Sequence, residues 1–182
     1  MNDFIVSCGS TADLSEETAK KRNIAVLPFC FRIGETDYAD DFGKSISNEE
    51  FYKLTSGGAK VKTSQISSGR YVEFFEPFLK DGKDVLHVTL SSGLSGTYES
   101  CLSAKKELEA KYPERKVYVI DSLCGSMGYG MLVLSAADYR DEGRSAAEIA
   151  ALLEEDRKKV KAFYFTPDLS AFIRGGRLSP AA

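Results

Sequence analysis

The sequence predicts an α/β domain built around a mostly parallel sheet, with helices packed on both faces. Apolar runs that suit strands alternate with amphipathic runs that suit helices, and this alternation is typical of parallel sheets. Three of the predicted strands, near residues 5, 88 and 118, each end in a turn rich in glycine and serine. Ligands of such sheets bind beyond the carboxyl ends of the strands. The chain of 182 residues is predicted to form one domain over 1–182.

The predicted strands are short apolar runs bounded by turn-forming residues. The second predicted strand, at 24–28, continues as an extended segment toward a turn at Gly34. In the last one, Phe163 and Phe165 alternate with Tyr164, which suits a strand with two different faces. In chain order, the five strands are expected at 4–6, 24–28, 85–90, 116–120 and 161–166.

The predicted helices are marked by serine caps and by apolar residues at helical spacing. Ser47 and Glu50 have the spacing of a capping box, and Ser145 is expected to cap a later helix. In chain order, the helices are expected at 15–22, 47–57, 68–80, 98–112, 131–139, 145–159 and 167–174.

Composition and charge argue against several classes of protein. The net charge is −3 and the isoelectric point is about 5.4, whereas nucleic-acid binders concentrate cations. No apolar run approaches the ~20 residues of a membrane span, and the N-terminus does not have the pattern of a signal peptide. The four cysteines are far apart, which predicts reduced, buried thiols in a cytoplasmic protein. We expect no metal and no cofactor, with Asp37, Asp40 and Asp41 as a weak alternative for a cation site.

The stretch from Val85 to Glu99 is the most informative part of the chain. An apolar strand runs into a turn of small and hydroxyl-bearing residues, and a helix follows. Such a turn presents backbone N–H groups and the positive end of the helix dipole. With the hydroxyls of Ser91, Ser92 and Ser95, this arrangement suits a carboxylate or a phosphate. The alternative is that Ser95 or its neighbour only caps the helix.

A serine hydrolase is a second interpretation of the same turn. Gly93–Thr97 approaches the Gly-x-Ser-x-Gly nucleophile motif, but Thr97 stands where the last glycine belongs. The only histidine, His87, precedes the serine and is expected to pack inside the strand. The remaining hydroxyls near strand ends favour binding over proton transfer, because none titrates near neutral pH. They are Ser10, Thr11, Thr63, Ser64, Ser91, Ser92 and Ser122.

Four motifs along the chain resemble, in order, the signatures of the DegV family. They are Ser10–Leu14, Thr63–Ser67, Ser91–Tyr98 and Gly175–Ser179. The resemblance implies a bacterial protein that binds a long-chain fatty acid and presents its carboxylate to a fatty acid kinase for phosphorylation. It implies a binding protein with no catalytic residues of its own. The alternative is an esterase that uses Ser92 or Ser95, with its base outside this chain.

The resemblance also implies which residues hold the carboxylate. The threonine of the second motif and a serine of the third map onto Thr63 and Ser92. Their neighbours Ser64, Ser91 and Gly93 are the next candidates. We expect Thr63 and Ser92 to converge from adjacent strand ends of the parallel sheet.

The segment around Gly175 and Gly176 resembles the point where the family enters its second domain. Arg174 and Arg177 flank these glycines and are expected to help dock the kinase.

This sequence departs from the family pattern at three places. Gly9 stands where an aspartate usually precedes Ser-Thr, and Ile66 stands where the second motif usually has proline. The family also continues into a second domain that encloses the acyl tail, whereas this sequence ends at Ala182. We therefore expect either a part of a longer protein or a different mode of binding.

Overall fold

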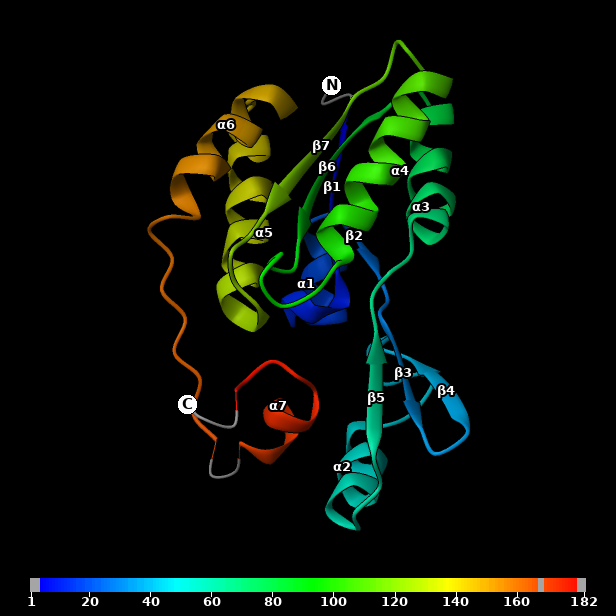
Figure 1. Ribbon diagram of the computed structural model, residues 1–182. Coiled ribbons are helices and arrows are strands. Elements are labelled where there is room, and N and C mark those ends of the chain that lie inside the picture. The colour runs from blue at the N-terminus through cyan, green and yellow to red at the C-terminus, as the bar shows by residue number, and fades with distance from the viewer. Residues whose placement is uncertain (1–3, 167–168, 180–182) are drawn as a thin grey trace.

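The computed structural model describes residues 4–166 and 169–179, and its centre is a four-stranded parallel sheet (Figure 1). The strand order is β2-β1-β6-β7, and every pair of neighbours runs parallel. The bounds are β1 Phe4–Gly9, β2 Ile24–Leu27, β6 Asp84–Thr89 and β7 Val117–Asp121. These strands are rich in apolar residues and largely buried because helices cover both faces of the sheet. The predicted fold class is confirmed.

Two pairs of helices cover the two faces of the sheet (Figure 1). On one face lie α3 (Ser68–Lys80) and α4 (Thr97–Lys111), and on the other lie α5 (Ser126–Asp141) and α6 (Ala146–Asp156). The short helix α1 (Glu16–Lys21) connects β1 to β2. None of the helices in the described residues is long and apolar enough to cross a membrane.

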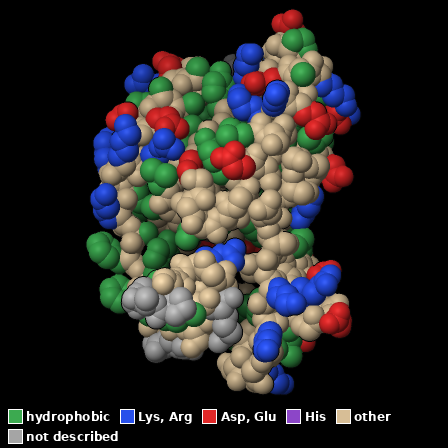
Figure 2. Space-filling view, in the orientation of Figure 1, with side chains coloured by type: hydrophobic (Ala, Val, Ile, Leu, Met, Phe, Trp, Pro, Cys, Tyr) green, Lys and Arg blue, Asp and Glu red, His purple; other side chains and the backbone are tan. Residues whose placement is uncertain are grey.

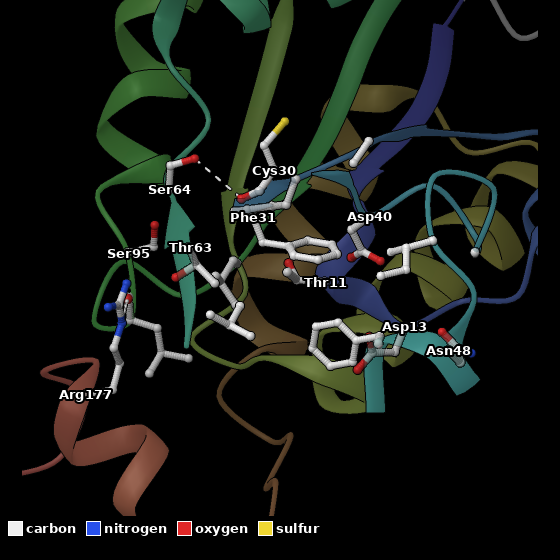
Figure 3. Close-up of a pocket in the computed structure, with 18 of the residues that line it drawn as sticks. Thr11, Asp13, Cys30, Phe31, Asp40, Asn48, Thr63, Ser64, Ser95 and Arg177 are labelled. Atoms are coloured by element: carbon white, nitrogen blue, oxygen red, sulfur yellow. Dashed lines mark hydrogen bonds between the residues drawn. The ribbon is translucent and has the colours of Figure 1, made fainter. Parts of the chain in front are cut away.

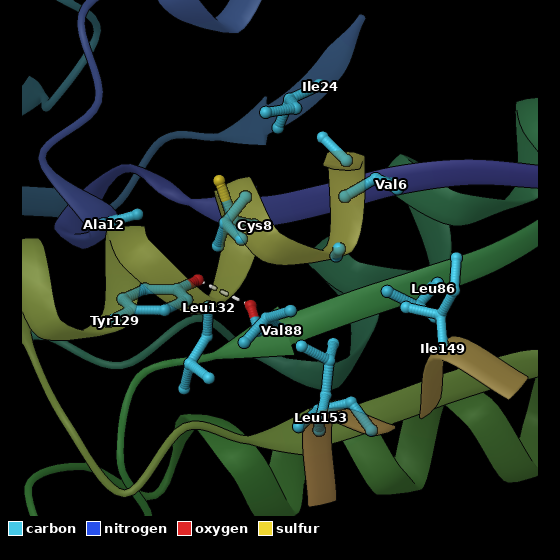
Figure 4. Close-up of a cluster of buried hydrophobic side chains, with 14 of the residues drawn as sticks. Val6, Cys8, Ala12, Ile24, Leu86, Val88, Tyr129, Leu132, Ile149 and Leu153 are labelled. Atoms are coloured by element: carbon cyan, nitrogen blue, oxygen red, sulfur yellow. Dashed lines mark hydrogen bonds between the residues drawn. The ribbon is translucent and has the colours of Figure 1, made fainter. Parts of the chain in front are cut away.

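Each face of the sheet has its own hydrophobic core. Against α5 and α6, Val6 and Leu86 pack with Ile149 and Leu153, as Figure 4 shows. Against α3 and α4, the buried strand residues Val85 and Val117 pack with Phe75 and Leu108.

The hydroxyl of Tyr129 ties the ends of two strands together. It donates to the backbone oxygen of Val88 at 2.6 Å, and it accepts the N–H of Gly9 at 2.7 Å (Figure 4). Gly9 is also tightly enclosed, because a Cβ there would lie 2.7 Å from the ring of Phe29. The backbone is therefore held in place where the turns after β1 and β6 begin.

A second, antiparallel sheet lies beyond the carboxyl ends of the parallel strands (Figure 1). Its order is β4-β3-β5, with β3 Cys30–Ile33, β4 Thr36–Ala39 and β5 Val61–Ser64. The helix α2 (Asn48–Ser56) lies between β4 and β5 in sequence. The sequence predicts only an extended segment at β3 and no strand at β4 or β5, so this sheet is a correction.

Several other expectations about single elements need correction. The segment 161–166 is not a strand in the structure, and the side chains of Phe163 and Phe165 are 81% and 95% exposed. Figure 2 shows hydrophobic side chains protruding along this segment, beside α7. The helix expected at 131–139 begins earlier, at Ser126. The last helix, α7, covers Ser170–Arg174, while 167–168 lie outside the described residues.

The two serine caps are present, with one difference between them. The Ser145 hydroxyl accepts the N–H of Glu148, and the Glu148 carboxylate accepts the Ser145 N–H, which completes a capping box. The Ser47 hydroxyl accepts the N–H of Glu50 at 3.1 Å. Among the described residues, the Glu50 carboxylate does not accept a hydrogen bond from the Ser47 N–H, so this cap is not a full capping box.

Candidate functional site

A pocket of about 680 Å³ lies where the two sheets meet (Figure 3). Its wall comes from β3 and β5, from the turns after β1 and β6, from α2 and its preceding loop, and from the α7 segment. The volume falls within the range of about 300–1,000 Å³ that is typical of small-molecule sites.

The middle of the pocket is apolar, with both aromatic and aliphatic side chains. Its main apolar side chains are Phe29, Phe31, Ile46, Phe51, Leu90 and Leu94. Phe31 stacks on Tyr38 and meets Phe51 edge to face, with centroids 5.6 Å and 5.4 Å away. These contacts fix the ring of Phe31 in the wall. The wall therefore suits a hydrocarbon ligand.

One end of the pocket carries hydroxyl groups. Thr63 and Ser64 come from β5, and Ser95 comes from the turn after β6 (Figure 3). The Ser64 hydroxyl donates to the backbone oxygen of Cys30 at 3.4 Å and is held within its own sheet. The Thr63 hydroxyl has no recorded partner within the described part of the chain and is available for a ligand.

The hydroxyl of Ser95 is set up to donate into the pocket. Its oxygen accepts the N–H of Thr97 at 3.3 Å and lies 2.8 Å from the Thr97 hydroxyl. Thr97 is buried, and its oxygen accepts the N–H of Ile66 at 3.4 Å. A buried hydroxyl proton without an acceptor is costly, and Ser95 is the acceptor within reach. When Thr97 donates in this way, the proton of Ser95 is left for a ligand.

The other three predicted residues of this turn have different surroundings. The buried hydroxyl of Ser91 accepts the N–H of Gly93 at 3.2 Å, and the N–H of Ser92 donates to Asp121 at 3.1 Å. The N–H groups of Leu94 and Ser95 donate to the backbone oxygen of Ser91. These N–H groups hold the turn itself, and none of Ser91, Ser92 and Gly93 is among the residues that line the pocket.

The expected geometric reason for pairing Thr63 with Ser92 is wrong. β5 belongs to the antiparallel sheet, so Thr63 does not lie at a strand end of the parallel sheet. The structure instead brings Thr63 into the same pocket as Ser95. The sequence contained a signal for this choice, because Ser95 and Thr97 are two hydroxyls placed where α4 begins.

Arg177 also lines the pocket, beside Ser95 and Thr63 (Figure 3). Its Nε donates to the backbone oxygen of Leu94 at 3.4 Å. No carboxylate pairs with it in the described part of the chain. Arg174 lies in α7, and its side chain is outside the described residues.

The only histidine does not reach these hydroxyls. His87 is fully buried in β6, its Nδ1 lies 2.9 Å from the Ser7 hydroxyl, and its ring packs on Tyr71 and Phe75. Burial lowers the pKa of His87 to about 3. The histidine is therefore not a base for Ser92 or Ser95.

Two of the three aspartates that suggested a weak cation site have other partners. Asp37 pairs with Arg32 at 2.6 Å, and Asp41 accepts the N–H groups of Lys44 and Ser45 at 2.9 Å. The guanidinium of Arg32 lowers the pKa of Asp37, and hydrogen bonds from Ser45 lower that of Asp41. Within the described residues, no group of three ligand side chains could hold a metal ion.

Comparisons with known proteins agree with this architecture. A DegV domain-containing protein of Clostridium perfringens is 35% identical over 182 residues, which is 100% of this chain and 62% of that protein. The structure of DegV, a fatty acid binding protein from Bacillus subtilis, matches with a TM-score of 0.85 and 30% identity, over 100% of this chain and 63% of that one.

A third match is to the Fatty Acid Kinase (Fak) B3 protein of Streptococcus pneumoniae, loaded with linoleic acid. Its TM-score is 0.79 over 100% of this chain and 63% of that one, and its 22% identity shows a shared fold. The chain thus spans less than two thirds of the proteins it matches.

The family model described as "Uncharacterised protein, DegV family" matches residues 5–182. This match covers nearly the whole chain and includes both sheets and the pocket between them. The chain belongs to the DegV family.

Proposed function

We propose that this domain binds a long-chain fatty acid in the pocket between the two sheets. The observation that carries the proposal is the pocket itself, which joins an apolar, aromatic wall to an end with two hydroxyls and a guanidinium. A carboxylate at that end is met by Thr63, Ser95 and Arg177. The acyl chain then lies against the wall around Phe31. The B. subtilis relative is described as a fatty acid binding protein, which supports this assignment.

The two parts of the ligand contribute differently to binding. Each buried methylene contributes ~0.8 kcal/mol, so a tail of about fifteen methylenes supplies ~12 kcal/mol before entropic costs. A hydrogen bond to a charged acceptor contributes about 1.5–3 kcal/mol. The tail therefore dominates affinity, and the polar end decides the orientation of the carboxylate.

The predicted residues Ser64, Ser91, Ser92 and Gly93 have a supporting role in this proposal. Ser64 fixes β5 against β3 through the backbone oxygen of Cys30. Ser91 accepts from Gly93, and Ser92 is bound by Asp121, which holds the turn that presents Ser95.

The test compares a fatty acid with the matching fatty alcohol. Thr63→Val and Ser95→Ala should each weaken binding of the acid about tenfold, because each removes one bond to a charged group. Binding of the alcohol should change less. Ser92→Ala is the matched control in the same turn and should leave both affinities within threefold. Equal losses for acid and alcohol would contradict the proposal.

We also propose that the bound carboxylate is presented to a fatty acid kinase. The match to a protein that is named for such a kinase supports this step. Arg177 is exposed beside the polar end of the pocket. We propose that Arg177 contacts both the carboxylate and the kinase, and docking by Arg174 stays a prediction.

The kinase step is tested by acyl phosphate formation with a fatty acid kinase. Arg174→Ala should slow the reaction and leave the affinity for fatty acid unchanged. Arg177→Ala should lower both. An Arg177→Ala protein with normal affinity and normal turnover would remove that residue from both roles.

A further inference from the structure

The charged side chains in the pocket wall are separated by sign. Among the described residues that line the pocket, three carry a formal charge: Arg177, Asp13 and Asp40. In Figure 3, Arg177 lies with Thr63 and Ser95 on one side of the Phe31 ring, and the two aspartates lie on the other side. The pocket thus has a cationic end and an acidic end with an apolar middle.

The backbone fixes both aspartates in place. Asp13 has a left-handed backbone (φ 55°), and its N–H donates to Ser10 at the end of a short helical turn. The N–H of Asp40 donates to the backbone oxygen of Phe29 at 2.8 Å. These bonds hold the backbone of both residues at that end, and both side chains are exposed.

No cation neutralises the acidic end in the described part of the chain. The lysine closest in sequence, Lys44, pairs with Glu16 at 2.7 Å. The nearby start of α2 contributes the positive end of a helix dipole, but its first turn also carries Glu49 and Glu50, which offset it. Both charged side chains of the described wall at this end are therefore negative, and a carboxylate bound there would meet like charge.

We propose that Asp13 and Asp40 determine which ligands the pocket accepts and which way round they bind. The inference rests on the proposed binding of fatty acids. A carboxylate at the acidic end meets two like charges, whereas at the other end it meets a guanidinium and two hydroxyls. A monocarboxylic acyl chain therefore binds in one direction, and a dicarboxylic acid of the same length is rejected.

The buried hydroxyl of Thr11 adds a second feature to the acidic end. Its oxygen is buried and has no recorded partner in the described residues, and Thr11 belongs to the same wall. Together with Asn48, it gives this end polar groups that tolerate a neutral hydroxyl on a ligand. The selection thus acts on negative charge rather than on polarity.

Three ligands of equal chain length test the proposal: hexadecanoic acid, omega-hydroxyhexadecanoic acid and hexadecanedioic acid. The wild-type protein should bind the first two with affinities within about tenfold and the diacid much more weakly. In the double variant Asp13→Asn/Asp40→Asn, the penalty of the diacid relative to the hydroxy acid should shrink about tenfold. Asparagine keeps the shape of both side chains and tolerates the left-handed backbone at position 13.

The matched control is Asp81→Asn/Glu114→Gln. It removes the same charge from the two turns before β6 and β7. These turns lie at the amino ends of the parallel strands, opposite the end that faces the pocket. This control should leave the diacid penalty unchanged. Raising the salt concentration offers a second test on the wild-type protein, because screening should shrink the penalty without any substitution.

The outcomes separate the two proposals. Binding of hexadecanoic acid with a diacid penalty that neither the double variant nor salt reduces would overturn the role of Asp13 and Asp40 alone. A wild-type protein that binds none of the three ligands would overturn the proposed function, and this inference with it.

Discussion

The two sheets of this domain have different tasks, and their side chains differ accordingly. The parallel sheet is covered on both faces, and its central strands β1 and β6 are almost entirely buried. The antiparallel sheet has short, partly exposed strands, and β5 is exposed at Lys62, Thr63 and Ser64. The first sheet holds the domain together, and the second forms part of the pocket. Stability and binding can therefore be changed separately.

The largest expected contrast is between two phenylalanines. Phe75 on α3 is fully buried against the parallel sheet, whereas Phe31 on β3 is half-buried in the pocket wall. Phe75→Ala should lower the free energy of unfolding by about 3–5 kcal/mol. Phe31→Ala should lower it by about 1–1.5 kcal/mol, since less area is buried, and should weaken fatty acid binding. Urea unfolding measures the loss of stability in both variants. Equal losses would contradict the proposed difference between the two sheets.

The second contrast is the response of the parallel sheet to acid. The pKa of His87 is lowered to about 3 in the folded state, against about 6.5 in the unfolded state. Below pH 6.5, His87 binds a proton in the unfolded chain but stays neutral in the folded chain. The free energy of unfolding should therefore fall by about 1.4 kcal/mol per pH unit as the pH drops from 6.5 toward 3.

The matched variant for this pH dependence is Ser7→Ala/His87→Leu. It removes both partners of the buried hydrogen bond at once, and such paired replacements are close to neutral. Unfolding measured between pH 7 and pH 5, above the range in which most carboxyl groups titrate, should then be nearly flat. An unchanged slope would show that His87 is not the group that titrates.

A third contrast concerns Tyr129, whose hydroxyl joins the ends of β1 and β6. Tyr129→Phe keeps the ring in the core but leaves the Gly9 N–H and the Val88 oxygen without this partner. The expected loss of stability is about 1–3 kcal/mol. The Ser64→Ala variant removes a bond of 3.4 Å within the antiparallel sheet and should cost less than about 1 kcal/mol. Thermal unfolding of the two variants checks the order.

The smallest expected effect on stability is at Thr63. The side chain is exposed on β5 and has no recorded bond in the described residues, so Thr63→Val should change the free energy of unfolding by less than about 0.5 kcal/mol. Its affinity for fatty acid should nevertheless fall. A large loss of stability would mean that Thr63 supports the sheet instead of the ligand.

The sequence predicted the parallel sheet well because its strands are encoded locally. The apolar runs at 4–6, 24–28, 85–90 and 116–120 are bounded by turns, and burial on both faces explains their composition. The caps at Ser47 and Ser145 are local signals in the same sense. These elements needed no knowledge of their neighbours.

The antiparallel sheet could not be predicted in the same way. β5 is short and polar, and its pairing joins Thr63 to Phe31, residues that are distant in sequence. Conversely, the alternation at 161–166 is a genuine strand pattern, but the segment is not paired with either sheet. A strand needs a partner, and a local pattern does not show one.

The candidate site was predicted in part for the same reason. The hydroxyl-rich motifs indicated Thr63 and the turn after β6, and both contribute residues to the pocket; their role in holding a carboxylate stays a prediction. Our proposal of Ser95 in place of Ser92 depends on how the turn is folded, which includes the bonds to Asp121 and between Ser95 and Thr97. The role of Asp13 and Asp40 depends on where distant loops meet.

The close contact between Gly9 and Phe29 also limits which side chains position 9 of this chain can accept. The resemblance to the DegV signatures predicts aspartate at position 9, whereas a Cβ there would lie 2.7 Å from the Phe29 ring in this protein. A side chain at position 9 would therefore require the ring of Phe29 to move. The single change Gly9→Asp should therefore destabilise the fold. The same change combined with a smaller side chain at position 29 should be tolerated.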